Sequence, residues 1–215
     1  VRAAAALIHS LTKALDDGHV YVPEDVLIQT AINLIGADAP VGQELGQLKE
    51  EGRVVDDGGI YLPFAYSLET ELASRLISMA RQVPNVVSHH LSMVEHRVGI
   101  DLATEQRDAV ECAASAPVMV LTGGPGTGKT TTVRTIVKVL SAAGEDVVMA
   151  APTGRAARRL AEATGGSAAT LHRLLGFHPV DGFRYNEDDP LPADAVIVDE
   201  ASMLDQSLAV ALLRA

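Results

Sequence analysis

Apolar residues recur at helical spacing through the N-terminal part of the chain. Residues 1–17 and 23–35 each place apolar side chains three or four positions apart, which predicts two amphipathic helices joined by a connector with a short extended piece. In the next segment Val41, Leu45 and Leu48 recur at i, i+4 and i+7, so they share one helical face. The pattern therefore predicts three consecutive helices.

A turn signal follows the third of these helices. Gly52 is placed to supply a left-handed C-cap, and residues 53–63 have two apolar runs around Asp-Asp-Gly-Gly, which predicts a β-hairpin. Three helices followed by a hairpin is the element order of a winged helix. Another amphipathic helix is predicted over residues 65–82. We expect residues 1–97 to form this helical and winged-helix domain.

The pattern changes in the second half of the chain, where apolar runs of the buried-strand type alternate with helical segments. A strand is predicted at 116–123, a helix at 129–144, a strand, turn and helix at 146–165, and a strand at 194–198. Strands that alternate with helices predict an α/β domain built on a parallel sheet. We expect this domain to occupy residues 98–215.

The turn after the first of these strands reads LTGGPGTGKTTT, residues 121–132. Gly123, Gly128, Lys129 and Thr130 fit G-x-x-x-x-G-K-[ST], in which backbone N–H groups surround phosphate oxygens at a helix N-terminus. We expect Lys129 to reach the β- and γ-phosphates of ATP and the Thr130 hydroxyl to bind Mg²⁺. A flexible glycine-rich loop without a ligand is the alternative. The other members of the predicted ATP site are Gly124, Pro125, Gly126, Thr127 and Thr131.

An acid pair ends the last predicted strand. A parallel sheet brings the carboxyl end of that strand, with Asp199 and Glu200, beside the phosphate loop. We expect Asp199 to bind Mg²⁺ and Glu200 to polarise a water for attack on the γ-phosphate. Glu200 and Lys129 are therefore the predicted catalytic residues. Taken alone, such a pair is also common as the acidic first turn of a helix.

Composition narrows the class of protein. The chain has 215 residues, 47% of them hydrophobic, and a net charge of −11, which predicts a soluble folded protein without a broad nucleic-acid-binding surface. Any DNA contact must be local. Basic residues concentrate at Arg155, Arg158 and Arg159, which form either such a contact or a solvated helix face. No apolar run is long enough to predict a membrane span.

Two further features of the sequence, a single cysteine and a group of histidines, predict no functional site. The single cysteine, Cys112, excludes an internal disulfide, fits a reducing cytoplasm and is expected to pack as a small apolar helix residue. His89, His90 and His96 are close in sequence, but adjacent helical side chains point about 100 degrees apart. Because no cysteine or second carboxylate completes a ligand set, we expect no metal there.

An ordered series of motifs surrounds the phosphate loop. LATEQRDAV, TGGPGTGKTTT, APTGRAARRLAEATG, ATLHRLLG and VIVDEASM follow one another over roughly residues 100–205. This series resembles the superfamily-one DNA helicases, and most closely their long, stand-alone RecD-like branch, which is related to the exodeoxyribonuclease V alpha subunit. The N-terminal half also resembles the region that precedes the motor in that branch.

The resemblance implies a RecA-like P-loop NTPase domain and roles for further residues. Gln106 corresponds to the glutamine that contacts adenine in that family. Pro152, Thr153 and Arg155 correspond to the segment that lines the channel for single-stranded DNA. His172 lies in a stretch that is also associated with DNA, and a buried, hydrogen-bonded histidine is the alternative.

The resemblance further implies an enzyme, an ATP-dependent DNA helicase that moves 5′ to 3′ on single strands in DNA repair and recombination. The implied partners are single-stranded DNA and duplex junctions, and the implied location is the bacterial cytoplasm, at the nucleoid. The chain ends before a Gly-Asp-x-x-Gln sensor and a second RecA-like domain with its arginine finger. We therefore expect a truncated motor that hydrolyses ATP barely by itself.

Two other functions stay open. A remodelling or loader ATPase that acts on proteins is disfavoured by the Gln106 segment and by the Pro-Thr-Gly turn. A non-enzymatic nucleotide-binding adaptor would tolerate loss of Glu200. The third predicted helix carries Glu44, Glu50 and Glu51 against Lys49 alone, so we expect the winged helix to have a structural or protein-contact role rather than to read DNA.

Overall fold

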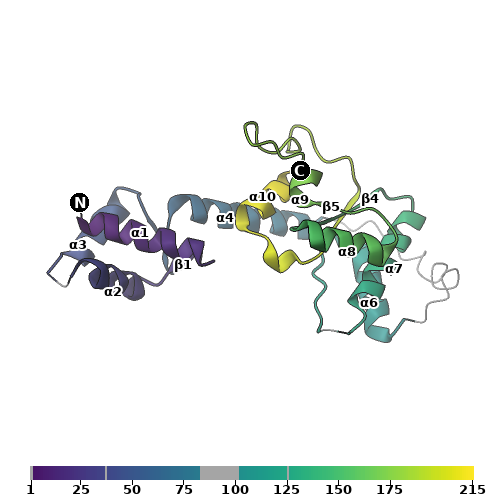
Figure 1. The fold of residues 1–215 in the computed structure, drawn as a ribbon, viewed down its shortest axis with the longest axis horizontal. Coiled ribbons are helices and arrows are strands. Elements are labelled where there is room, and N and C mark those ends of the chain that lie inside the picture. Colours follow the sequence, from purple (N-terminus) through teal and green to yellow (C-terminus); the bar gives the residue numbers. More distant parts are fainter. Residues whose placement is uncertain (1, 37, 83–101, 125) are drawn as a thin grey trace. The chain divides into compact units, whose positions relative to one another are not determined.

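The computed structural model describes residues 2–36, 38–82, 102–124 and 126–215 (Figure 1). The chain divides into two compact units, Val1–Glu71 and Leu72–Ala215, and each is described by itself. The boundary predicted between residues 97 and 98 lies outside the described residues.

The first unit contains the predicted helices and hairpin. Its strands form an antiparallel sheet in the order β1-β3-β2, in which Tyr61 lies opposite both Tyr21 and Val55. The last helix begins in this unit and continues past its boundary. In chain order the elements are α1 Arg2–Asp16, β1 Tyr21–Val22, α2 Glu24–Ile35, α3 Val41–Glu50, β2 Val55–Asp56, β3 Ile60–Tyr61 and α4 Pro63–Ala80.

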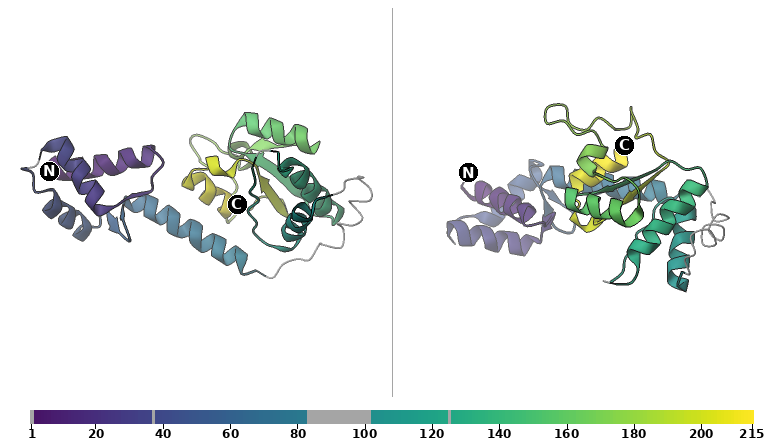
Figure 2. Two further views of the ribbon diagram at one scale, coloured as in Figure 1. Left: turned by 90° about the horizontal axis from the view of Figure 1, so that it is seen from below. Right: turned by 45° about the vertical axis from the view of Figure 1, so that its right-hand side comes forward.

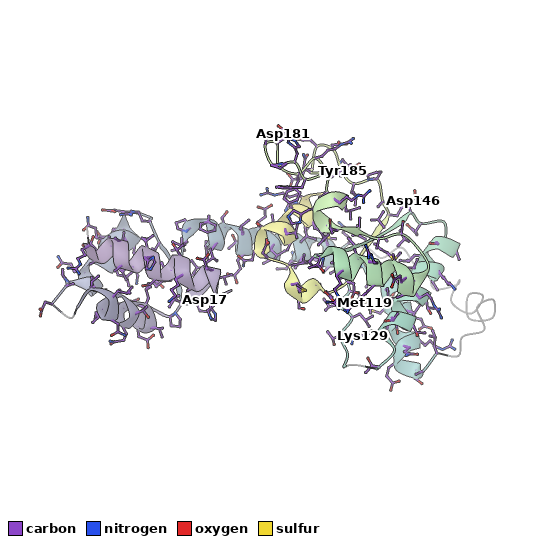
Figure 3. All side chains as sticks on the ribbon, in the orientation of Figure 1. Asp17, Met119, Lys129, Asp146, Asp181 and Tyr185 are labelled. Atoms are coloured by element: carbon purple, nitrogen blue, oxygen red, sulfur yellow. The ribbon has the colours of Figure 1, made fainter. Side chains whose placement is uncertain are left out.

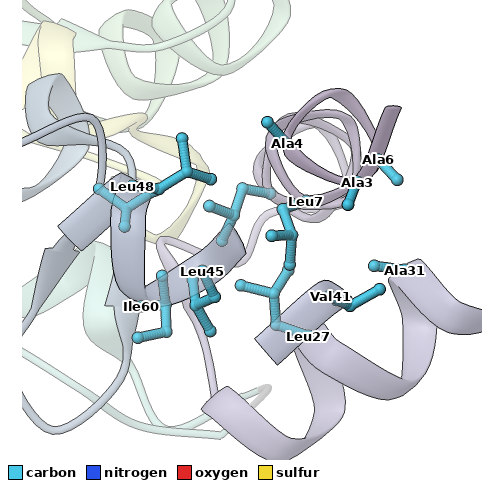
Figure 4. Packing of buried hydrophobic residues seen from close by; sticks show 12 residues of the cluster. Ala3, Ala4, Ala6, Leu7, Leu27, Ala31, Val41, Leu45, Leu48 and Ile60 are labelled. Carbon is cyan, nitrogen blue, oxygen red and sulfur yellow. The ribbon is translucent and has the colours of Figure 1, made fainter. Parts of the chain in front are cut away.

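The core of the first unit lies between its three helices and the hairpin (Figure 4). The predicted apolar face of α3 is confirmed, because Val41, Leu45 and Leu48 are each at most 2% exposed. Burial of one such side chain contributes about 1.5–3 kcal/mol. The predicted C-cap is also confirmed: Gly52 has φ +67°, and the Arg53 N–H donates to the Leu48 carbonyl at 2.9 Å.

The second unit is built on a parallel sheet with the order β5-β4-β6 within the described residues. The helix predicted to follow the phosphate loop is confirmed, as are the strand-turn-helix and the last strand. Figure 2 shows helices on both sides of this sheet. In chain order the elements are α6 Thr104–Ser115, α7 Lys129–Ala142, β4 Val147–Ala151, α8 Gly154–Thr164, β5 Ala169–Thr170, α9 Leu171–Leu174, β6 Ala195–Val198, the 3₁₀ turn η2 Ala201–Met203 and α10 Gln206–Arg214.

Side-chain alternation along β6 explains how helices cover both faces of the sheet. Ile197 packs against the apolar cluster of α6 and α7, whereas Val198 packs against the cluster of α9 and α10. Successive residues of a strand point to opposite faces. The short apolar run is therefore a strand with helices packed against both faces, although Val196 is still 39% exposed.

One predicted strand is wrong. Residues 116–124 lie in no helix or strand, and Val120 in this segment is 81% exposed. β-branched residues favour extended backbone, but a strand also needs a hydrogen-bonded neighbour and a face to bury. Within the described residues this segment pairs with none of the three strands of the sheet. The phosphate loop is therefore preceded by irregular backbone.

Three smaller predictions have different outcomes. Cys112 is exposed, so the prediction that it packs in the interior is wrong; the buried face of α6 carries Val110 and Ala114, and Cys112 lies between them on the other side of the helix. His89, His90 and His96 lie outside the described residues. Across the ranges that the structure describes, no helix combines the length and apolar character that crossing a bilayer requires.

Candidate nucleotide site

The phosphate loop depends on glycine at its turn positions. Gly126 and Gly128 have φ of +77° and +82°, a region that other residues rarely adopt. A Cβ atom on Gly128 would lie 2.2 Å from Nε2 of Gln106, and one on Gly123 would lie 2.8 Å from Oγ1 of Thr127. Gly128 is also the N-cap of α7 and has no side chain to cap it. The N–H groups that begin α7 are thus left for another acceptor, such as an anion.

Side chains of the loop bind its own carbonyl groups. The Lys129 ammonium donates to the carbonyls of Gly123 and Gly124, the second at 2.8 Å. The Thr127 hydroxyl donates to the same Gly124 carbonyl at 2.9 Å. Figure 3 labels Lys129 at the start of its helix. The ammonium is thus held at the loop, where it would meet a phosphate.

The other predicted ATP ligands in this stretch lie close to the start of α7. Thr130 and Thr131 lie in its first turn, and Thr130 is exposed. Gly124 precedes the turn and is exposed too. Pro125 lies outside the described residues.

The C-terminal half of α7 packs beside the sheet. The C-terminal half of α7, with Ile136 and Val139, packs against Val147 and Ala195, the first residues of β4 and β6. Gly144 then turns the chain directly into β4 with φ +92°. The end of α7 thus lies near the amino ends of these strands.

The acid pair is held at the carboxyl edge of the sheet by backbone hydrogen bonds. The Asp199 N–H donates to the Ala150 carbonyl at 3.0 Å, which extends the β4–β6 ladder by one step. Oδ1 of Asp199 accepts the Glu200 N–H at 2.9 Å, which leaves the second carboxylate oxygen for a cation. Both acids are exposed. Mg²⁺ takes few protein ligands and keeps several waters, so the Thr130 hydroxyl and the Asp199 carboxylate are donors of the right kind.

Glu200 has an unusual backbone. Its φ of 53° and ψ of 40° lie in the left-handed region, and among the described residues it is the only one besides glycine with positive φ. For a residue with a Cβ this conformation costs about 1–3 kcal/mol. Such strain persists where the surrounding structure imposes it, and it is common in active sites. The turn aims the Glu200 side chain away from the direction that a continuing strand would give it.

Gln106 joins α6 to the phosphate loop. Its Oε1 accepts the Ala103 N–H at 3.1 Å, at the start of α6, and its Nε2 donates to the Thr127 carbonyl at 3.2 Å. The sequence resemblance implies a contact with adenine for this residue. The structure places its amide directly against the loop that would hold the triphosphate.

The predicted DNA residues follow β4. Pro152 and Thr153 directly follow Ala151, the last residue of that strand, so they share the carboxyl edge with Asp199. Oγ1 of Thr153 accepts the Ala156 N–H at 3.2 Å and so caps α8. Arg155 is exposed in the first turn of α8, and Arg158 and Arg159 are exposed one turn later.

One of the two alternatives predicted for His172 is wrong. It is exposed on α9, so the buried histidine is wrong. Its ring lies 5.2 Å from that of Phe177 and 5.8 Å from that of Phe183, and the two phenylalanine rings are 5.0 Å apart. Aromatic surfaces of this kind can stack on nucleobases. Sequence reasoning missed Phe177 and Phe183, although two of the three phenylalanines of the chain stand close together here.

Comparison with known proteins agrees with these motifs. A family model described as the AAA domain matches residues 106–215. The ATP-dependent RecD2 DNA helicase of Deinococcus radiodurans is 36% identical over 231 aligned residues, which cover all of this chain and 32% of that protein. The RecBCD enzyme subunit RecD of Mycobacterium tuberculosis is 43% identical over 134 residues, 52% of this chain and 23% of that protein.

A viral protein is also similar. The ATP-dependent DNA helicase dda of Enterobacteria phage T4 is 34% identical over 100 residues, 42% of this chain and 22% of that protein. The chain thus spans about a third of the length of the D. radiodurans relative and less of the other two. The region matched by the family model begins at Gln106 and includes each predicted site residue. The chain therefore belongs to the AAA-domain family, and within it to the RecD-like superfamily-one helicases.

Proposed function

We propose that the full-length protein is an ATP-dependent DNA helicase that moves 5′ to 3′ along single-stranded DNA and acts at duplex junctions. One observation carries the proposal. The acid pair after β6 and the Pro-Thr-Gly turn after β4 follow the carboxyl ends of neighbouring parallel strands, and we propose that the start of α7 lies at the same edge. In open α/β sheets this edge is where ligands bind. A triphosphate and a DNA strand would thus be bound by neighbouring segments.

The nucleotide half of the proposal assigns a role to each group at the edge. The N–H groups that begin α7 and the Lys129 ammonium hold the β- and γ-phosphates. Thr130 and Asp199 hold Mg²⁺, which would neutralise phosphate charge when bound. Glu200 accepts a proton from the attacking water, because its carboxylate lies next to Asp199 and is exposed. Gln106 recognises adenine.

The DNA half of the proposal rests on Pro152, Thr153, Arg155 and His172. Arg155 supplies positive charge for a phosphate of the strand, and the His172 ring extends an aromatic surface for the bases. A strand bound to the turn at Thr153 would pull on α8, because the Thr153 side chain caps that helix. DNA binding and nucleotide hydrolysis would in this way involve neighbouring backbone segments, which follow β4 and β6.

The N-terminal part of the chain has a different proposed role. We propose a helical and winged-helix domain over residues 1–97 and a RecA-like ATPase domain over residues 98–215. The order α1-β1-α2-α3-β2-β3 and the sheet order β1-β3-β2 support the winged helix. Lys49, the only basic residue of α3, is bound to the carboxylates of Glu24 and Asp56 at 2.7 and 2.6 Å. Because that charge is neutralised, we propose that α3 contacts protein rather than DNA.

Substitution of Glu200 tests the proposal in the full-length protein. Glu200→Gln removes the proton acceptor, so DNA-stimulated phosphate release should fall by on the order of 10²- to 10⁴-fold while ATP still binds. Strand displacement should fail with it, and the wild-type protein should prefer substrates with 5′ overhangs. Glu111→Gln, an exposed acid on α6, is the matched control and should behave as wild type. Phosphate release that survives Glu200→Gln would overturn the role of Glu200, and a wild-type protein that binds ATP without releasing phosphate would favour the nucleotide-binding adaptor.

A further inference from the structure

An apolar groove lies between α1 and α2 in the first unit. Its volume is about 440 Å³, and its lining comes from the two helices and from the connector with β1 that joins them. Figure 1 shows α1 and α2 side by side. Ser10 and Leu27 are buried parts of the lining, whereas Tyr21, Val26 and Leu34 are between 44% and 52% exposed. The groove is therefore open to solvent.

The helix α2 is apolar over a wider arc than the core of the first unit requires. Leu27 and Ala31 are fully buried in that core. Val26 and Leu34, with Thr30 between them, form a second row at i, i+4 and i+8 that lines the groove and is exposed. An amphipathic helix that packs on one core needs a single apolar stripe. The second row therefore indicates a further contact.

The hydroxyl groups of Ser10 and Thr30, which line the groove, are bound within their own helices. Ser10 donates to the Ala6 carbonyl and Thr30 to the Val26 carbonyl, each at 2.8 Å. A small-molecule pocket orients its ligand with a few polar groups, and these two hydroxyls have no hydrogen left to donate. An open apolar groove between helices instead suits an amphipathic helix with apolar anchors at i, i+4 and i+7. Val26 and Leu34 are about 12 Å apart along α2, a span that such anchors match.

Charge selects the kind of helix that fits. Asp17, labelled in Figure 3, lines the groove directly after the end of α1 and is exposed, and Lys13 precedes it by one turn. Two more exposed acids, Asp16 and Asp25, flank this connector end of the groove in sequence. The first unit as a whole has twelve Asp or Glu and four Lys or Arg, so it repels nucleic acid and a second copy of itself. The connector end therefore attracts a basic residue of another protein.

We propose that this groove binds an amphipathic helix of a protein partner, which places apolar side chains against Val26 and Leu34 and a lysine or arginine at Asp17. The inference does not rest on the proposed helicase activity, because every residue that it uses belongs to the first unit. It also differs from the protein contact proposed for α3, since α3, which is described in full, contributes no residue to the groove. Binding would cover the second apolar row of α2 and leave the core of the unit unchanged.

Synthetic helical peptides test the groove in the full-length protein. One peptide carries leucines at i, i+4 and i+7 with an arginine beside the first leucine, and a second peptide has glutamate in place of the arginine. Fluorescence anisotropy should show saturable binding of the arginine peptide, about two- to fivefold tighter than that of the glutamate peptide. Asp17→Asn should remove this preference. Asp38→Asn, which changes an exposed acid outside the groove, is the matched control and should keep it.

Substitutions in the second row of α2 test the apolar contact. Leu34→Gln should weaken binding of both peptides about fivefold to twentyfold, and Val26→Thr, which keeps the shape of the side chain, should act in the same direction. Asn33→Gln, at the neighbouring exposed position outside the groove, should bind as wild type. Thermal melting checks that each variant is folded.

Three results would overturn the proposal. The first is that neither peptide binds the wild-type protein, which would mean that the groove takes no such helix. The second is equal binding by wild type, Leu34→Gln and Val26→Thr. The third is self-association or DNA binding of the wild-type protein that Leu34→Gln abolishes, because a second copy or a nucleic acid would then occupy the groove.

Discussion

The two units of the chain differ in how strongly acidic they are. Residues 1–71 contain four Lys or Arg and twelve Asp or Glu, whereas residues 72–215 contain thirteen and sixteen. In the first unit Lys49 is bound by two carboxylates. In the second, Arg155 and its neighbours on α8 are exposed at the proposed DNA edge. Most of the net charge of −11 thus comes from the first unit, so it says little about the surface of the second.

The units also differ in where residues with positive φ lie. In the first unit, positive φ at Gly52 ends a helix over a closed core. In the second, Gly126 and Glu200 adopt positive φ at exposed positions of the candidate site, and Gly128 does so at a partly exposed one. Strain at an exposed site does not help the fold, so it must be supported by packing elsewhere. The comparison indicates that the second unit gives up stability at Glu200, within the candidate site.

The largest expected effect comes from relaxing that strain. Glu200→Gly suits a φ of 53°, so the free energy of unfolding should rise by about 1 kcal/mol. DNA-stimulated phosphate release should nevertheless fall by on the order of 10²-fold or more, because the carboxylate is lost. Thermal melting checks the expected gain in stability, and a phosphate-release assay checks the expected loss of activity. Lower stability in this variant would contradict the strain assigned to Glu200.

Gly128→Ala should weaken nucleotide binding next most strongly. The added Cβ would meet both a positive φ and the Gln106 amide, so ATP affinity should fall roughly tenfold to a hundredfold. Gly144→Ala is a matched control, because φ there is +92° and nothing lies within 4 Å of the new Cβ. The control should lower stability and leave ATP affinity intact. Equal losses of affinity in both variants would mean that the loop is not the ligand site.

The charge contrast is tested by one arginine from each unit. Arg155→Ala should weaken single-stranded DNA binding about threefold to tenfold and lower the salt slope by about 0.7, the value for one phosphate of a single strand. Arg53→Ala removes an exposed charge from the first unit and should change neither quantity. The affinity for single-stranded DNA, measured at several salt concentrations, distinguishes the two variants. A similar loss with Arg53→Ala would show that DNA also contacts the acidic unit.

The smallest expected effect concerns the ion pairs of Lys49. The hydrogen bonds that the Lys49 ammonium donates to Asp56 and Glu24 raise the pKa of Lys49 above its ordinary value, so its stabilising contribution is complete below the pKa of lysine in the unfolded chain. The contribution is lost as pH rises through the folded value, above about 10.4. Lys49→Met should therefore lower stability by about 0.5–1 kcal/mol near neutral pH, with the deficit disappearing at high pH.

Denaturant unfolding at several pH values measures this deficit. Lys13→Met, an exposed residue of α1, is the control and should show no such pH dependence. A deficit in Lys49→Met that persists above the titration of lysine would mean that the side chain stabilises the unit by packing rather than by charge.

Local patterns predicted most of the elements, because these depend on residues close in sequence. The spacing of Val41, Leu45 and Leu48 was sufficient for α3, and the glycine and lysine spacing located the phosphate loop. The strand at 116–123 was predicted wrongly, since pairing depends on a neighbour that the segment itself does not specify. The bond between Gln106 and Thr127 and the left-handed Glu200 could not be predicted either. Both arise from tertiary contacts between distant segments.

The pairing of β4 with β6 sets the distance between the Thr153 turn and Asp199, across which a mechanical force would be transmitted. β4 leads into the Thr153 turn and β6 into Asp199, and the last rung between them is a single peptide hydrogen bond to Ala150. Adjacent strands lie about 4.8 Å apart. Tension from a gripped strand would therefore reach the cation ligand across one rung, without a relay of side chains.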